Sequence, residues 1–330
     1  MRNRWLIALA AIGLHISIGS VYAWSVLTRP IMADMGFTMS QTTWTFSLAI
    51  LMLGLSAGFL GSFAEKIGPK KSGLLSMLFW VAGLLGTAYA LSIHNLTLLY
   101  LFYGIIGGIG LGIGYITPVS TLVKYFPNRP GFATGLAIMG FGFASLIAGP
   151  LMQFLVAQVG LVSNFIILGI IYLVVMGASS LYLKAPQPKQ PPRTTKDKST
   201  MYVHNHGMLA NDAMKTWQFG ALWWIFFINI TCGIGLLSLA SPMAQETIGM
   251  TPAAAASLVG IIGIFNGGGR ILTAWGLAGI VGPMLVSYFH EAGYGYTTAL
   301  VCFALLFVLN TIIAIILKIY GKRGLHKRYC

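Results

Sequence analysis

The sequence predicts an all-α, polytopic membrane protein, and two observations support this fold class. Of the 330 residues, 57% are hydrophobic and 8% are charged, and the mean hydropathy is +0.81. A soluble domain, by comparison, contains roughly 25% charged residues. In addition, apolar segments of about 20 residues, the length of a helix that crosses a bilayer, recur along the chain. They predict eight helices, at residues 5–27, 44–64, 72–92, 96–123, 132–156, 163–183, 217–240 and 295–318.

The basic residues predict how these helices are oriented. If the N-terminus is in the cytoplasm, the cytoplasmic segments hold all 20 lysines and arginines except Arg29 and Arg270. Cytoplasmic loops of membrane proteins are enriched in these residues, so we expect a multi-pass protein of the inner (plasma) membrane with both termini in the cytoplasm. The short basic clusters alternate with apolar segments, which argues against nucleic acid as a partner.

A polar segment divides the chain into two parts. Residues 184–215 contain four prolines, six basic residues and few large aliphatic side chains. This composition predicts a cytoplasmic linker. It separates a first part, residues 1–183, with six helices from a second part, residues 216–330, with about four.

No residue pattern indicates an enzyme, a metal site or a cofactor. The three cysteines, Cys232, Cys302 and Cys330, are isolated and form no CxxC pair. The sequence contains no nucleophile elbow, no zinc-binding HExxH motif and no set of kinase motifs. We therefore expect a protein without catalytic activity and without a bound cofactor.

Arg270 is a single cation within a long apolar stretch, residues 253–289. An arginine at mid-bilayer costs about 2.5 to 3.5 kcal/mol on insertion scales, so such a residue usually faces a polar interior. Arg270 is therefore a candidate for binding an anion. The alternative is an arginine near a membrane edge that extends its guanidinium to the lipid headgroups. The apolar residues on both sides favour the first interpretation.

The same stretch raises a question of helix count. It has 37 residues, too many for one comfortable crossing and few for two. A single crossing would place the basic tail, residues 318–328, outside the cell. We therefore expect a broken pair of helices that folds back near Gly267, Gly268 and Gly269, where glycines permit a turn.

Glycines in the fourth helix predict close helix packing. Gly104, Gly108 and Gly112 follow one another at a spacing of four, as do Gly110 and Gly114. This spacing lets neighbouring helix backbones approach each other. A phosphate-binding loop is a poor alternative, because no strand precedes the glycines and no GK[ST] sequence follows them.

The loop after the second helix, GSFAEKIGPKKSG at residues 61–73, resembles the signature loop of the major facilitator superfamily. The matching positions are Gly61, Glu65, Gly68, Lys70 and Lys71. The resemblance implies two six-helix halves joined by a long linker, which are parallel repeats in this superfamily. It also implies that the loop locks helices during alternating access. Positive-inside signalling alone is the other interpretation of the basic pair.

Longer stretches are similar to one family within that superfamily, the oxalate/formate antiporters. They are GSVYAWSV at residues 19–26, KYFPNRPGFATGLAIMGFG at 124–142 and ITCGIGLLSLASPMAQE at 230–246. The resemblance implies transport of small carboxylates. Oxalate-transporting members have an arginine that aligns with Arg270 and a lysine where this chain has Trp275. One cation in place of two favours a monocarboxylate such as formate, lactate or pyruvate, and oxalate/formate exchange is the alternative.

The same resemblance predicts an internal deletion. Residues similar to helix eight end at Arg270, and residues similar to helix eleven begin at Leu272. The linker is preceded by 183 residues and followed by 115, a shortfall of 68 for equal halves. We therefore expect a truncated second half, about ten helices in place of twelve, and weak transport. A non-transporting remnant is the competing interpretation.

The remaining candidates lie in the first part of the chain. His15, Gly19 and Tyr22 occupy positions i, i+4 and i+7 of the first helix and share one face. His15 can carry a proton near neutral pH, or form a neutral hydrogen bond between helices. Tyr115 aligns with a tyrosine that lines the carboxylate pocket in the family, and the alternative is an aromatic residue of the membrane interface or of the helix packing. We expect His15, Tyr22 and Tyr115 to bind the substrate together with Arg270 and Trp275.

The mode of coupling stays open at this point. No Asp or Glu falls inside the eight predicted helices. Proton coupling would therefore need His15 or a titrating substrate, whereas anion exchange needs neither.

Overall fold

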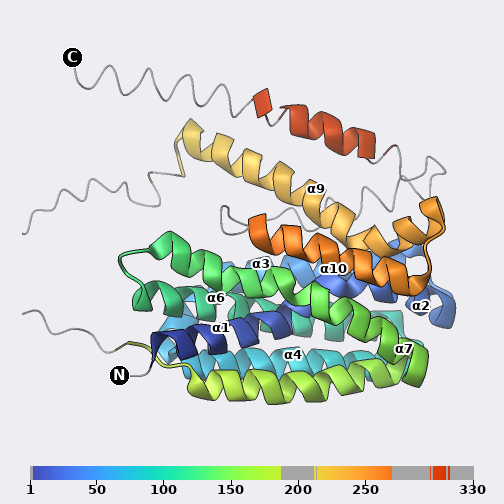
Figure 1. Ribbon diagram of the computed structural model, residues 1–330, viewed down its shortest axis with the longest axis horizontal. Coiled ribbons are helices and arrows are strands. Elements are labelled where there is room, and N and C mark those ends of the chain that lie inside the picture. The colour runs from blue at the N-terminus through green and yellow to red at the C-terminus, as the bar shows by residue number, and fades with distance from the viewer. Residues whose placement is uncertain are drawn as a thin grey trace, which may run out of the picture.

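A computed structural model describes residues 3–186, 212, 214–269, 298, 300–309 and 311–312. These residues are mostly helical (Figure 1). Within them, six helices are long and apolar enough to cross a membrane. All of the first seven predicted helices are present, which confirms the all-α, multi-pass fold class. Of the eighth, the structure describes a helix at Leu300–Leu309.

The first crossing consists of three parts. They are α1 (Arg4–Gly19), the 3₁₀ turn η1 (Ser20–Ala23) and α2 (Trp24–Met35). The sequence predicted one helix over 5–27, so the break and the extension to Met35 correct that prediction. The Ser20 hydroxyl donates to the carbonyl oxygen of Ser17 at 2.7 Å, a local side-chain bond of the kind that competes with regular helix.

The other helices keep the predicted order. They are α3 (Met39–Ile67), α4 (Pro69–Ser92), α5 (Leu96–Leu99), the π-helical segment η2 (Tyr100–Gly107), α6 (Gly108–Tyr125), α7 (Pro130–Tyr182), α9 (Trp217–Ile248) and α10 (Pro252–Gly269). α5, η2 and α6 together form the predicted fourth helix. A capping box begins α3, because Thr38 Oγ1 accepts from the Gln41 amide at 3.2 Å and the Gln41 side chain accepts from the Thr38 amide at 3.0 Å.

α7 is two crossings joined by a sharp break. Its apolar part, Gly131–Tyr182, has 52 residues. A straight helix of that length would extend ~78 Å, far more than the thickness of a bilayer. The break lies at Gly160, where φ is 81° and ψ is 173°. This division agrees with the two helices that the sequence predicted at 132–156 and 163–183.

Replacing Gly160 by alanine should lower the free energy of unfolding by about 1 to 3 kcal/mol, because this backbone conformation is almost restricted to glycine. A steric clash of the new side chain does not contribute, because nothing lies within 4 Å of a Cβ built at Gly160. The matched control is Gly233→Ala, a glycine inside α9 with equally open surroundings and no positive φ. Thermal unfolding in detergent measures the transition temperatures of Gly160→Ala and Gly233→Ala. A transition temperature for Gly160→Ala equal to that of the parent chain would contradict the expectation.

The glycines of α6 pack against two neighbouring helices. Gly108 and Gly112 face α3, and a Cβ at Gly112 would lie 2.5 Å from a backbone carbonyl oxygen of that helix. Gly110 and Gly114 face α4, and a Cβ at Gly110 would lie 2.6 Å from a backbone amide nitrogen there. The predicted use of these glycines for close helix packing is therefore confirmed.

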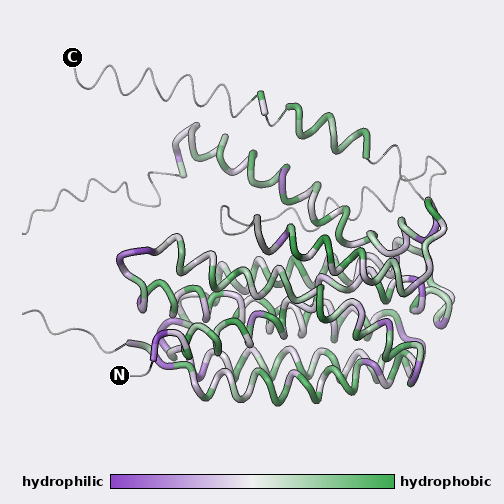
Figure 2. The backbone as a smooth tube through the Cα atoms, in the orientation of Figure 1, coloured by the Kyte–Doolittle hydropathy of each residue, from purple (hydrophilic) through white to green (hydrophobic). Residues whose placement is uncertain are grey.

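Polar and basic residues gather at one end of the helix bundle. There the Lys124 ammonium lies 3.1 Å from the Glu65 carboxylate, and the Tyr125 hydroxyl donates to the Lys184 carbonyl oxygen at 3.0 Å. The Arg4 guanidinium lies beside them, 5.5 Å from the ring centroid of the residue after Tyr125. Figure 2 shows the apolar middle of the helices between polar ends. The helix ends that the sequence assigned to the cytoplasm therefore lie together at one end of the bundle. That this end faces the cytoplasm, and that the membrane is the plasma membrane, stay predictions.

Two of the helices after the linker, α9 and α10, pack on the first part of the chain. α10 lies between α9 and α7, and α9 also contacts α2 (Figure 1). The Arg29 guanidinium donates to the Gln245 side chain at 3.3 Å across the contact of α2 with α9. The predicted division at residues 184–215 stays a prediction, since most of that segment lies outside the described residues.

One expectation about the second part needs correction. α10 remains helical to Gly269, so the predicted turn does not lie within Gly267–Gly269. The physical reason is that a helix satisfies its own backbone groups where water is absent, which outweighs the cost of about 1 kcal/mol for each glycine. The rest of the proposed fold-back, residues 270–289, lies outside the described part of the chain.

Candidate functional site

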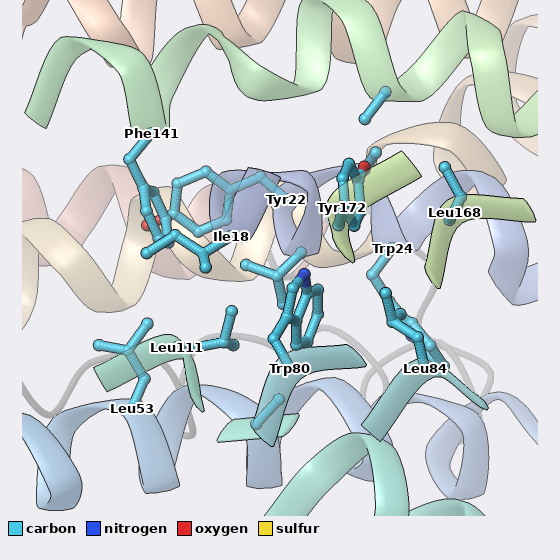
Figure 3. Packing of buried hydrophobic residues seen from close by; sticks show 14 of the residues in the cluster. Ile18, Tyr22, Trp24, Leu53, Trp80, Leu84, Leu111, Phe141, Leu168 and Tyr172 are labelled. Atoms are coloured by element: carbon cyan, nitrogen blue, oxygen red, sulfur yellow. The ribbon is translucent and has the colours of Figure 1, made fainter. Parts of the chain in front are cut away.

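Three of the five predicted substrate-binding residues lie around one phenylalanine, Phe141 of α7. The ring centroids of Tyr22 and Phe141 are 4.8 Å apart, those of Tyr115 and Phe141 5.6 Å, and those of His15 and Phe141 6.1 Å. His15 comes from α1, Tyr22 from η1 and Tyr115 from α6. We call these four residues the His15 cluster. Figure 3 shows Tyr22 beside Phe141.

Two glycines let α1 approach α7 closely enough to form this cluster. A Cβ on Gly19 would collide with the backbone carbonyl oxygen of Phe141. A Cβ on Gly140 would lie 3.1 Å from the carbonyl oxygen of Ile12 and 3.3 Å from the Cβ of His15. The face predicted for His15, Gly19 and Tyr22 is therefore the face that packs on α7.

The imidazole of His15 is held by backbone carbonyl oxygens of two other helices. Its Nδ1 lies 2.5 Å from the Ala137 oxygen of α7, and its Nε2 lies 3.0 Å from the Tyr115 oxygen of α6. The side chain is fully buried. His15 thus joins three helices of the first part at one point, as an interhelical hydrogen-bonding residue does.

Tyr115 is the most exposed member of the cluster. His15 and Phe141 are 0% exposed and Tyr22 is 1% exposed, whereas Tyr115 is only partly buried. Tyr115 also lies next to His15, with 5.6 Å between the ring centroids.

α10 runs antiparallel to the part of α7 that carries Phe141. Along α10, Ala256 contacts Gly149, Gly260 contacts Leu146, and Gly263 contacts Gly142 and Ser145. Both helices rise equally per residue, so in this register the end of α10 lies near the level of Ala137, the residue that holds His15. The chain continues from that end directly into Arg270. Arg270 and Trp275 themselves lie outside the described residues.

The signature loop lies at the polar end of the bundle, away from the His15 cluster. Gly68 has φ 82° and ψ 163° and lets the chain turn from α3 into α4. Glu65 forms its ion pair with Lys124 beside a small pocket lined by both side chains. Lys70 and Lys71 are exposed in the first turn of α4. Gly61 packs against α6, where a Cβ would lie 3.2 Å from Ile116 Cδ1.

Sequence reasoning missed Phe141, the residue that connects the cluster. It lies within the stretch GFG, an aromatic residue between two glycines of a helix, and this pattern was a usable signal. A second aromatic group, Trp24, Trp80 and Tyr103, is also buried among the helices. Trp24 and Trp80 lie with centroid distances of 4.4 Å and 5.6 Å to the Tyr103 ring. Figure 3 shows Trp24 and Trp80 among aliphatic side chains, as part of the core.

Comparison with known proteins identifies the family to which the chain belongs. A family model described as Major Facilitator Superfamily matches residues 7–277. The chain is 32% identical over 275 residues to the uncharacterized MFS-type transporter YhjX of Escherichia coli, covering 82% of this chain and 65% of that protein. It is 26% identical over 271 residues to the oxalate:formate antiporter of Oxalobacter formigenes, covering 81% and 62%.

A relative that matches a shorter part of the chain is human monocarboxylate transporter 14, which is 29% identical over 174 residues, covering 51% of this chain and 33% of that protein. The chain therefore spans less than two thirds of the length of these relatives. The predicted internal deletion stays a prediction.

Solved structures show the same fold. A bacterial homologue of the human lysosomal transporter Spinster, in an inward-facing and unoccupied conformation, aligns with a TM-score of 0.59 at 14% identity, covering 100% of this chain and 86% of that one. A D-xylose–proton symporter aligns with a TM-score of 0.56 at 15% identity, covering 80% and 66%. At these identities the likeness concerns the fold alone.

Proposed function

Because the chain belongs to the Major Facilitator Superfamily, we propose that it is a secondary active transporter of small carboxylates, with monocarboxylates such as lactate, pyruvate or formate as substrates. One observation carries this proposal. The His15 cluster is a buried polar and aromatic site in the first part of the chain, and α10, which leads directly into Arg270, ends near its level. Substrate sites in this superfamily lie near the bilayer midplane between the two halves.

The chemistry of the proposed residues fits a carboxylate. A guanidinium is planar and always charged, and it binds both oxygens of a carboxylate through two parallel hydrogen bonds. In a site of low dielectric constant this attraction is much stronger than in water. We assign this role to Arg270. The Tyr115 hydroxyl is a further donor, and the rings of Tyr22, Phe141 and Trp275 limit the size of the substrate.

The number of cations favours a single carboxylate group. Trp275 stands where oxalate-transporting proteins of the similar family have a lysine, which leaves Arg270 as the cation of the proposed site. A second carboxylate would then be desolvated without a charged partner, which is costly. Oxalate/formate exchange is the second candidate, favoured by the likeness to the antiporter of Oxalobacter formigenes.

The proposal includes a location and a mechanical part. We place the chain in the inner (plasma) membrane with the basic end of the bundle in the cytoplasm, because that end carries Lys66, Lys70, Lys71, Lys124 and Arg129.

The signature loop acts as a lock between transport states. The ion pair between Glu65 and Lys124 joins the end of α3 to the end of α6. The Glu65 side chain is 49% exposed and the Lys124 side chain 52% exposed. Such a pair contributes only about 0.2 to 1 kcal/mol to stability, so it can form and break during a transport cycle.

Counterflow in proteoliposomes tests the proposed function. Vesicles that contain the purified chain and are loaded with unlabelled lactate should accumulate labelled lactate from outside. An excess of pyruvate or formate should compete more strongly than oxalate. Preferential competition by oxalate would favour the exchange candidate instead. Accumulation no greater than in protein-free vesicles would contradict transport and support the interpretation as a remnant.

A further inference from the structure

We infer that the chain binds an anionic phospholipid at the basic end of the bundle, between the start of α1 and the turn that joins α6 to α7. Arg4 and Arg129 bind the headgroup phosphate, and the rings of Trp5, Phe126 and Phe132 lie beside it. We call these five residues the Arg4 patch. Binding of the lipid follows from the membrane-crossing fold and is independent of the substrate that the chain transports.

Aromatic rings hold the Arg4 guanidinium in place. Its Cζ lies 5.8 Å from the ring centroid of Trp5 and 5.5 Å from that of Phe126. The Trp5 and Phe126 centroids are 5.5 Å apart, and the Phe132 centroid lies 5.9 Å from that of Phe126. A guanidinium is attracted to the faces of aromatic rings. The Arg4 side chain is therefore ordered before a ligand arrives, which reduces the entropy that binding costs.

Arg129 is attached to the same group of rings. It is the last residue of the turn before α7, and its amide donates to the Phe126 carbonyl oxygen at 3.0 Å. The side chains of Arg4 and Arg129 are both exposed. Within the described part of the chain neither guanidinium is paired with a carboxylate, and Glu65 at the end of α3 is paired with Lys124 at 3.1 Å. The N–H groups of both arginines are therefore available to an anion.

The surface next to the patch fits a lipid better than a soluble anion. Trp5 is 53% exposed and Phe132 46% exposed. On the first two turns of α1, Leu6 and Leu9 are 47% and 64% exposed, and this helix belongs to a membrane crossing. Cations and aromatic rings at the headgroup level, followed along the helix by exposed aliphatic side chains, match a molecule with a charged head and hydrocarbon chains. An acidic soluble protein would leave these aliphatic side chains uncovered.

The two arginines also select the headgroup. A guanidinium binds two phosphate oxygens through parallel hydrogen bonds. In phosphatidylglycerol the phosphate charge has no counterion within the headgroup. In phosphatidylcholine a trimethylammonium group balances that charge and would lie near two guanidinium groups of the same sign, which is unfavourable. We therefore expect phosphatidylglycerol to bind more tightly than phosphatidylcholine.

Native mass spectrometry of the purified chain in detergent, titrated with either lipid, measures the affinity for the first bound molecule. Arg4→Gln and Arg129→Gln should each weaken binding of phosphatidylglycerol about fivefold, and the double variant about 25-fold. The matched control is Lys66→Gln, which removes one exposed positive charge from the end of α3 at the same end of the bundle. Its affinity should equal that of the parent chain. A loss as large as that of Arg4→Gln would show attraction by the net charge of this end and overturn the site.

The soluble control for the ligand is glycerol 3-phosphate, which carries the phosphate without the hydrocarbon chains. At the concentration of the lipid it should not displace phosphatidylglycerol, because the exposed apolar side chains beside the patch contribute to binding. Displacement at that concentration would contradict a lipid as the ligand, and equal affinities for phosphatidylglycerol and phosphatidylcholine would contradict the role of the two arginines.

Cross-linking of the parent chain covers the case in which Arg4→Gln or Arg129→Gln does not fold. Phosphatidylglycerol with a photoactivatable group in its headgroup is added to the chain in phosphatidylcholine nanodiscs, and peptide mass spectrometry identifies the labelled residues. We expect more label within residues 3–9 and 126–132 than within residues 66–71, the basic segment between α3 and α4. Equal labelling of these segments would exclude a specific site at the Arg4 patch.

Discussion

Replacing Arg270 by glutamine is expected to weaken lactate binding to the purified chain by about 30-fold to several thousand-fold. Removing one partner of a desolvated, hydrogen-bonded charge pair costs about 2 to 5 kcal/mol, which corresponds to that range. Arg270→Lys should retain part of the affinity, because the charge remains and the two-pronged geometry is lost. Isothermal titration calorimetry measures the Kd of lactate for the parent chain, Arg270→Gln and Arg270→Lys.

Arg29→Gln is the matched control for this substitution. It also removes one positive charge, but Arg29 is exposed and contacts Gln245 at 3.3 Å, away from the His15 cluster. Its affinity for lactate should equal that of the parent chain. Undiminished binding by Arg270→Gln, with the protein still monodisperse, would exclude Arg270 from the site.

Replacing Gly112 by leucine is expected to prevent folding of the first part of the chain. A Cβ at this position would lie 2.5 Å from the Leu53 carbonyl oxygen and 2.8 Å from the Ala57 amide nitrogen. These are backbone atoms of α3, so the two helices must separate to make room. Overpacking on this scale costs about 3 kcal/mol or more, a large part of the total stability of a typical domain.

Gly54→Leu is the control, since Gly54 of α3 is exposed and nothing lies within 4 Å of its Cβ position. Size-exclusion profiles of fluorescent fusions in detergent compare the two variants. We expect a monodisperse peak for Gly54→Leu and aggregation for Gly112→Leu. Equal profiles would contradict the close approach of α6 to α3.

The sequence predicted the helical fold well because one strong signal controls it. Apolar segments of membrane-crossing length must be helical where water is absent, and this rule located the seven membrane crossings that the structure describes before residue 249. It could not locate the η1 turn or the π-helical segment, because these depend on local hydrogen bonds such as that of Ser20. It also placed a turn at Gly267–Gly269, where the backbone requirement keeps α10 helical.

The candidate site was predicted less completely. Helical periodicity placed His15, Gly19 and Tyr22 on one face, and the structure shows that this face packs on α7. Periodicity within one helix does not reveal the partner on another, so Phe141 was missed. The two carbonyl contacts of His15 depend on the spatial arrangement of three helices, and no spacing in the sequence reports them.

A double-mutant cycle tests most directly whether the His15 cluster and Arg270 form one carboxylate site. Lactate affinities are measured for the parent chain, Tyr115→Phe, Arg270→Lys and the double variant. If both residues bind the same carboxylate, their effects should not add, with an interaction energy of about 0.5 to 3 kcal/mol. Effects that add within ~0.5 kcal/mol, as for distant residues, would contradict a shared site.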